Sequence, residues 1–158
     1  SLVGSEMCIR DRLNRVRRSG SIPQFIQDYH IDNGILYGCV KHNIPFVLTG
    51  SIRDDGPLPE VYADAYQGAY AMRSLVRGAT TVICLATMLH TIAAGNMTPS
   101  FRVLPDGTVR PVYLYAVDAD EFVVNKLRDR GSLCATTMVT NVQDFITKVA
   151  RDLGVYPK

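Results

Sequence analysis

The sequence lacks several features that would assign it to a special class of protein. No run among its 158 residues approaches the ~18 apolar residues of a membrane-spanning helix. The first residues also lack the apolar stretch of a signal peptide. The four cysteines form no CxxC pair and the three histidines show no metal-ligand spacing. We therefore expect reduced thiols, no bound metal and a cytoplasmic protein.

An excess of charge of one sign is also absent. Five of the 17 basic and two of the 15 acidic residues lie in the first 18 positions, so the rest carries 12 basic and 13 acidic groups. Such a balance provides no electrostatic surface for nucleic acid or for an anionic membrane, and neither is expected as a partner. The basic segment Arg15–Arg18 is interpreted as a solvated helix end, with a phosphate contact as the alternative.

The first residues stand apart from the rest. The segment SLVGSEMCIRDR, Ser1–Arg12, shows no clear periodicity and resembles translated sequencing-adapter read-through. We expect residues 1–12 to be an extraneous tail, and a native flexible tail is the alternative. On the first interpretation, residues 13–158 are the C-terminal part of a longer domain.

From Ser21 onward, short apolar runs alternate with segments of helical periodicity. This alternation predicts an α/β fold with three layers, in which helices cover both faces of a single parallel sheet. The segment Pro105–Thr108 predicts a turn. The predicted strands are Phe46–Thr49, Thr81–Ala86, Val112–Val117 and Leu133–Val139. The predicted helices are Ile22–Tyr29, Asn33–His42, Val61–Arg77, Thr87–Gly95, Ala119–Arg130 and Val142–Leu153.

Polar residues follow each of the four predicted strands, and ligands of open parallel sheets bind outside the carboxyl ends of the strands. Asp118 could accept the hydroxyls of a ribose, although capping the next helix explains it equally well. Gly50 allows close backbone approach and Ser51 could donate to a phosphate, with an ordinary turn as the alternative. Thr87 could hold a phosphate at a helix start, and Asn141 caps the last helix. These five residues are the candidate nucleotide-binding set.

The loop GSIRDDGPLP follows the first predicted strand. Arg53 offers a guanidinium for a carboxylate, while Asp54 and Asp55 could bind an amine or orient Arg53. These groups suit a zwitterionic, amino-acid-like substrate, and a surface ion pair is the alternative. Pro57 and Pro59 stiffen the loop, which lowers the entropic cost of binding.

His90 lies about one helical turn into the predicted helix after the second strand. It is a candidate acid or base, and a partly buried histidine with a structural partner is the alternative. No GxGxxG pattern can be drawn through the 12 glycines. Either the nucleotide is held in another way, or part of its site belongs to the chain that would precede this one.

The strings IPFVLTGSIRDDGPLPE, ATMLHTIAAGNMTPS and VDADEFVVNKLRDRG resemble the C-terminal portion of the LOR/SDH bifunctional-enzyme family. That family includes archaeal-type ornithine cyclodeaminases and the C-terminal domains of arginine dihydrolase/ornithine cyclodeaminase fusions. The resemblance covers residues 14–158. It implies a Rossmann-like domain of the deoxyhypusine-synthase NAD/FAD-binding type, NAD as cofactor, and conversion of ornithine to proline and ammonia with a hydride borrowed and returned by NAD.

Residue chemistry, taken together with this reaction, suggests roles for the loop and for the histidine. Arg53 is expected to bind the substrate carboxylate, Asp54 or Asp55 the amine, and His90 to transfer a proton. The resemblance also implies a missing N-terminal region of the same protein, and a homo-oligomer is expected. A nucleotide-binding regulatory module and a structural C-terminal module remain as alternatives to the enzyme fragment.

Overall fold

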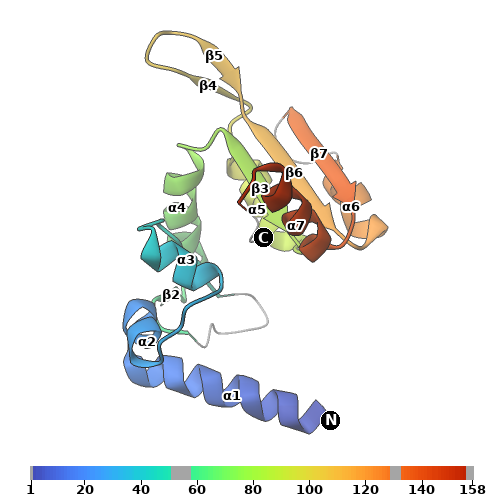
Figure 1. The fold of residues 1–158 in the computed structure, drawn as a ribbon. Coiled ribbons are helices and arrows are strands. Elements are labelled where there is room, and N and C mark those ends of the chain that lie inside the picture. Colours follow the sequence, from blue (N-terminus) through green and yellow to red (C-terminus); the bar gives the residue numbers. More distant parts are fainter. Residues whose placement is uncertain (1, 51–57, 129–132, 156–158) are drawn as a thin grey trace. The chain divides into compact units, whose positions relative to one another are not determined.

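A computed structural model describes residues 2–50, 58–128 and 133–155 of the chain. It contains two compact units, Ser1–Ala71 and Met72–Lys158 (Figure 1). None of the helices in the described ranges has both the length and the apolar character needed to cross a membrane. Cys39, Cys84 and Cys134 are free thiols.

The first unit is mostly helical. Its strands β1 and β2 pair in parallel, with Leu48 opposite Val61. Ser21 caps α2 as expected, because its side chain accepts a hydrogen bond from the backbone N–H of Gln24 at 3.2 Å. The elements are α1 (Leu2–Ser19), α2 (Ile22–Asp28), α3 (Ile35–Lys41), β1 (Leu48–Thr49) and β2 (Val61–Tyr62), followed by α4 (Ala65–Val76), which runs across the boundary between the units.

The predicted helix Val61–Arg77 is wrong at its beginning, because its first two residues form β2. The helix begins after Asp64, whose Oδ1 accepts hydrogen bonds from the N–H groups of Tyr66 and Gln67. Such an aspartate cap separates the strand from the helix. Gly68 allows α4 to pack tightly on β1, since a Cβ atom at this position would lie 2.8 Å from Thr49 Cγ2.

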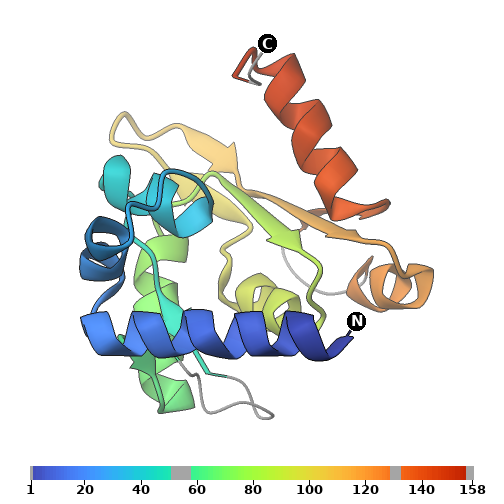
Figure 2. The same cartoon turned by 60° about the horizontal axis from the view of Figure 1, so that its bottom comes forward.

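The second unit contains a three-stranded parallel sheet in the order β3-β6-β7. Helix α7 lies on one face of the sheet, and α5 and α6 lie on the other, as Figure 2 shows from a second direction. Strands β4 and β5 form an antiparallel hairpin around the predicted Pro105–Thr108 turn. The elements are β3 (Thr81–Leu85), α5 (Leu89–Met97), β4 (Phe101–Val103), β5 (Val109–Pro111), β6 (Tyr113–Asp118), α6 (Glu121–Arg128), β7 (Cys134–Val139) and α7 (Val142–Asp152).

The predicted α/β class with helices on both faces of a parallel sheet is confirmed, but the predicted four-stranded sheet is wrong. Three of the predicted strands form the sheet of the second unit. The fourth, predicted as Phe46–Thr49, is reduced to the two residues of β1, which pair with β2 in the first unit. An apolar run indicates a buried strand but does not identify its neighbour, so the sequence did not specify this pairing.

The core of the second unit lies around β6, the central strand of the sheet. Leu114 and Ala116 are each only 1% exposed, and Val117 is 2% exposed. Val124 and Leu127 of α6 are also buried. This packing fixes the end of β6, where Asp118 lies.

Candidate functional site

The carboxyl ends of β3, β6 and β7 lie at one edge of the sheet. The strands run parallel, with Leu85 opposite Val117 and Asp118 opposite Val139. Hydrogen bonds continue one step beyond the ladders, from Ala86 N–H to the Val117 carbonyl at 3.0 Å and from the Thr140 N–H to the Asp118 carbonyl at 2.9 Å. The segments that carry Thr87, Asp118 and Asn141 therefore leave the sheet side by side, as the sequence predicted.

Asp118 ends β6 and is half-buried. Its Oδ1 atom accepts a hydrogen bond from the Asp120 N–H at 3.0 Å. Helix α6 is capped instead by Asp120, whose Oδ1 accepts from the Phe122 N–H at 2.8 Å. The alternative role considered for Asp118, that of helix cap, is thus filled by Asp120, and no described residue donates to the second oxygen of Asp118.

Asn141 is the N-cap of α7, as predicted. Its Oδ1 atom accepts hydrogen bonds from the N–H groups of Gln143, at 2.8 Å, and Asp144, at 3.4 Å. The side-chain oxygen is therefore occupied by the helix, and the donating amide nitrogen is the group that could contact a ligand.

Thr87 and His90 are in direct contact. Thr87 Oγ1 lies 3.1 Å from His90 Nδ1. The prediction that α5 starts at Thr87 is wrong, because the helix begins at Leu89 with Met88 at its N-cap. His90 is exposed rather than partly buried, and Thr87 is half-buried.

The turn between β3 and α5 is anchored in the core. Ala86 has a backbone φ of 52°, a left-handed conformation that is uncommon for residues other than glycine. Thr91, which is 3% exposed, donates its hydroxyl hydrogen to the Thr87 carbonyl at 2.5 Å. Burial raises the pKa of the Cys84 thiol on β3, and a hydrogen bond with the Thr91 side chain opposes this shift.

The GSIRDDGPLP loop is largely outside the described residues. Ser51, Arg53, Asp54 and Asp55 all fall in the range 51–57, so their predicted roles are untested. Gly50 is the last described residue before this range, and its N–H donates to the Tyr62 carbonyl at 3.3 Å within the first unit. The convergence of this loop with His90 and Asp118 stays a prediction.

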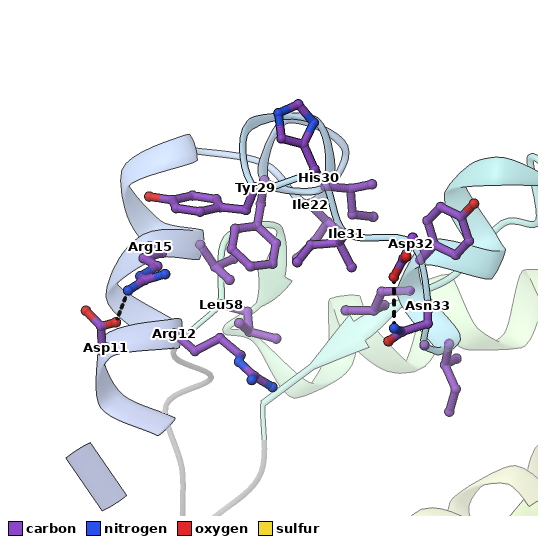
Figure 3. A pocket seen from close by; sticks show the side chains of 17 residues that line it. Asp11, Arg12, Arg15, Ile22, Tyr29, His30, Ile31, Asp32, Asn33 and Leu58 are labelled. Atoms are coloured by element: carbon purple, nitrogen blue, oxygen red, sulfur yellow. Dashed lines mark hydrogen bonds and ion pairs between the residues drawn. The ribbon is translucent and has the colours of Figure 1, made fainter. Parts of the chain in front are cut away.

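A pocket of about 810 Å³ lies in the first unit, between α1, α2, α3 and Leu58 (Figure 3). Its floor is apolar, with Ile22, Ile31 and Leu58 among the lining residues. At its rim the Arg15 guanidinium pairs with Asp11 at 2.6 Å and lies 5.5 Å from the centre of the Tyr29 ring.

The predicted site residues that the structure describes, Gly50, Thr87, His90, Asp118 and Asn141, are not among the residues that line this pocket. Asp11 belongs to the segment predicted to be an extraneous tail, so removal of that segment would open the pocket on the side of α1.

The groups at the sheet edge fit the nucleoside part of a dinucleotide. A carboxylate at the end of a parallel strand accepts hydrogen bonds from ribose hydroxyls, and Asp118 has this chemistry and place. The Thr87 hydroxyl and the Asn141 amide add polar groups in the segments that follow the two flanking strands, β3 and β7. A family model described as arginine dihydrolase ArgZ-like, C-terminal, Rossmann fold, matches residues 3–149. The chain belongs to this family.

Relatives of this ArgZ-like chain carry two kinds of name. The ornithine cyclodeaminase of Methanocaldococcus jannaschii is 41% identical over 141 residues, which are 89% of this chain and 31% of the relative. The ornithine cyclodeaminase of Methanothermobacter thermautotrophicus is 44% identical over 134 residues, 85% of this chain and 30% of the relative. The bifunctional arginine dihydrolase/ornithine cyclodeaminase ArgZ of Synechocystis is 41% identical over 141 residues, 89% of this chain and 19% of the relative.

Solved structures agree with the family. A conserved LOR/SDH protein from Methanococcus maripaludis S2 has a TM-score of 0.77 and 37% identity, covering 90% of this chain and 39% of that one. AgrE in complex with ornithine and NAD+ has a TM-score of 0.75 and 39% identity, covering 90% of this chain and 19% of AgrE. The resemblance read from the sequence and the Rossmann-like fold are thereby confirmed. The ArgZ-like chain spans about a third or less of the length of these curated relatives.

Proposed function

We propose that the chain is the C-terminal, NAD-binding part of an ornithine cyclodeaminase, which converts ornithine to proline and ammonia. The observation that carries the proposal is that Asp118 ends β6, while Thr87 and Asn141 lie in the segments that directly follow its two parallel neighbours, β3 and β7. Relatives named ornithine cyclodeaminase support it, as does the similarity to AgrE, whose structure contains ornithine and NAD+.

Bound NAD would supply the hydride acceptor and donor that the chemistry at the α-carbon of ornithine requires. The protein has to bind the substrate carboxylate, take up a proton from a substrate nitrogen and release it again, and fix the geometry of both ligands. We assign the carboxylate to Arg53, the amine to Asp54 or Asp55, and the proton transfer to His90. Gly50 and Ser51 complete the proposed nucleotide-binding set with the three strand-end residues.

The Asp118 assignment can be tested with a neighbouring control. Asp118→Ala removes a charged acceptor of ribose hydroxyls, so we expect affinity for NAD to fall by roughly 10- to 100-fold. Asp120→Ala removes the cap of α6 and should weaken the helix by about 1 kcal/mol while NAD affinity stays unchanged. Calorimetric titration of both variants with NAD, and with ADP-ribose as the smaller probe, measures the difference. Equal affinities for Asp118→Ala and the parent chain would remove the assignment.

The Arg53 assignment concerns the amino-acid substrate rather than the nucleotide. In the full-length protein, Arg53→Ala should raise the KM for ornithine by roughly 10- to 100-fold, because a charge-assisted pair with the carboxylate is lost. Arg53→Lys keeps the charge but loses the bidentate geometry, so an intermediate KM is expected. The affinity for NAD should stay the same in both variants. Parallel losses for ornithine and NAD would contradict the carboxylate role.

The short span of the chain favours one alternative of a different kind. Because it covers 19% of the bifunctional relatives, it could serve a larger enzyme as a nucleotide-binding regulatory or structural module. The upstream region of the same protein is the proposed partner in either case, together with further copies in a homo-oligomer. Ornithine-dependent proline formation that does not depend on NAD concentration, with NAD binding intact, would support this alternative.

A further inference from the structure

We propose that Thr87 is a positioning residue that holds the His90 imidazole by Nδ1 and leaves Nε2 as the nitrogen that exchanges protons with the substrate. The identity of the substrate rests on the proposed function. The contact itself is local, since both residues belong to the turn and the first helical turn that follow β3.

The 3.1 Å contact selects one nitrogen of the ring. Thr87 Oγ1 meets Nδ1, and Nε2 lies on the opposite side of the imidazole, out of reach of the same hydroxyl. An exposed histidine on a helix surface would otherwise sample several rotamers. A hydrogen bond at Nδ1 restricts the ring and determines which nitrogen is available to a ligand.

The segment that contains Thr87 is fixed by hydrogen bonds to residues of the protein interior. The hydroxyl of the buried Thr91 donates to the Thr87 carbonyl at 2.5 Å. Ala86 fixes the direction of the turn through its left-handed backbone and its bond to the Val117 carbonyl. A continuous series of contacts thus links the central sheet to the His90 ring, which is the support that a proton-transfer group requires.

A hydroxyl is suited to a ring that changes its protonation state. To take up a proton, Nε2 must carry a free lone pair, so the hydrogen of the neutral ring lies on Nδ1 and is donated to Thr87 Oγ1. This hydrogen bond persists when Nε2 is protonated as well. A carboxylate partner would instead favour the charged imidazolium. In the proposed reaction Nε2 takes one proton from a substrate nitrogen and later returns it to the departing ammonia, so the ring ends each turnover as it began.

The positioning role is compatible with the other predicted use of Thr87. In the tautomer with a free Nε2, Thr87 Oγ1 accepts from Nδ1–H and keeps its own hydrogen. An ionised phosphate oxygen can only accept a hydrogen bond, and the Thr87 hydroxyl remains available to donate one to it.

The test observes the two ring nitrogens in the 158-residue chain. Thr87→Val keeps the side-chain shape and removes the hydroxyl, whereas Thr87→Ser keeps the hydroxyl. In long-range ¹H–¹⁵N spectra, we expect Thr87→Val to move both His90 nitrogen signals to the values of a freely rotating imidazole. Thr87→Ser should retain the parent pattern. His42, an exposed histidine for which no side-chain hydrogen bond to a described residue is seen, supplies the reference for an unrestrained ring.

Unchanged amide signals for β6 establish that each variant keeps its sheet, and Thr87→Ala repeats the test if the valine variant fails to fold. His90 nitrogen signals that are the same in the parent, Thr87→Val and Thr87→Ala would overturn the proposal. These spectra require neither NAD nor ornithine, so they separate a failure of this inference from a failure of the proposed function.

In the full-length enzyme, Thr87→Val should lower kcat by about 10-fold or more with little change in the KM for ornithine. Thr87→Ser should stay near the parent value. Equal losses of kcat in the serine and valine variants would contradict a positioning role that acts through the hydroxyl.

Discussion

The two compact units of the chain bury apolar side chains to very different extents. Among the described residues, the unit Ser1–Ala71 has two buried apolar side chains, Val16 and Ile22, whereas the unit Met72–Lys158 has eight. The first unit pairs strands of two residues, and the second pairs β6 with both of its neighbours along five or six residues. A candidate site at the edge of a well-packed sheet thus has a rigid support, while the first unit carries an open pocket between short helices.

Of the substitutions that test this contrast, Leu114→Ala should lower the free energy of unfolding of the second unit most. The side chain is 1% exposed in the central strand, and removal of such a leucine costs about 2–5 kcal/mol of unfolding free energy. Urea unfolding measures the loss. Hydrogen exchange at single amides should show that protection falls in β3, β6 and β7 while α2 keeps its protection. A uniform loss of protection in both units would show that they unfold as one cooperative body, and the contrast would then disappear.

Gly68→Ala tests the tightest contact of the first unit. The added Cβ atom would lie 2.8 Å from Thr49 Cγ2, so we expect a loss of about 1–3 kcal/mol from overpacking. Thr49→Ser removes that methyl group and should restore most of the stability in the double variant. Gly38→Ala in α3 is the matched control, because a Cβ atom there meets nothing within 4 Å. It should stabilise the helix by about 0.5–1 kcal/mol, because alanine has the higher helix propensity. A loss of similar size at both positions would contradict close packing at Gly68 as the cause.

The Cys84 thiol should make a smaller, pH-dependent contribution to the free energy of unfolding of the second unit. Burial raises the pKa of this thiol above its ordinary value of 9.0, so the unfolded chain loses the proton first as pH rises. The stabilisation is therefore fully present below pH 9.0 and is lost as pH rises through the raised pKa of the folded state. The measurement compares the urea midpoints of the parent and Cys84→Ala between neutral and strongly alkaline pH. A decline of equal slope in both proteins would exclude this linkage.

The strands of the second unit were predictable because each is a short run of apolar and β-branched residues with a polar residue close to its end. Thr81–Leu85, Tyr113–Asp118 and Cys134–Val139 agree with the predicted strands to within one residue at each end. The placement of Asp118 and Asn141 at one edge followed from the parallel topology alone. The short strands of the first unit were harder to predict from the sequence. Val61–Tyr62 directly precedes α4 and was included in the apolar pattern of that helix, and its pairing with β1 depends on tertiary contacts.

The candidate site also has features that the sequence predicted and features that it did not. Residue types and their places after the strands indicated which side chains could bind a nucleotide. Side-chain contacts within a turn could not be predicted from residue types and their positions after the strands. The bond between Thr87 and His90, and the capping of α6 by Asp120 rather than Asp118, depend on where each helix begins. Helix ends vary by one or two residues for small differences in free energy, and a sequence pattern does not determine them at that level.

Deletion of Ser1–Arg12 should have the smallest effect of all. Backbone in residues 2–19 is helical, but the origin of the first 12 residues stays a prediction. The deletion removes the exposed ion pair between Asp11 and Arg15, whose contribution is at most about 0.5 kcal/mol. It leaves Val16, which is 5% exposed.

We expect the melting temperature of the truncated chain to change by less than about 2 °C in scanning calorimetry. Val16→Ala in the full chain is the matched control, because it removes apolar contacts from the buried face of α1 and should lower the melting temperature more than the deletion does. If the deletion lowers the melting temperature as much as Val16→Ala, the first residues contribute to the stability of the first unit and the prediction of an extraneous tail is wrong.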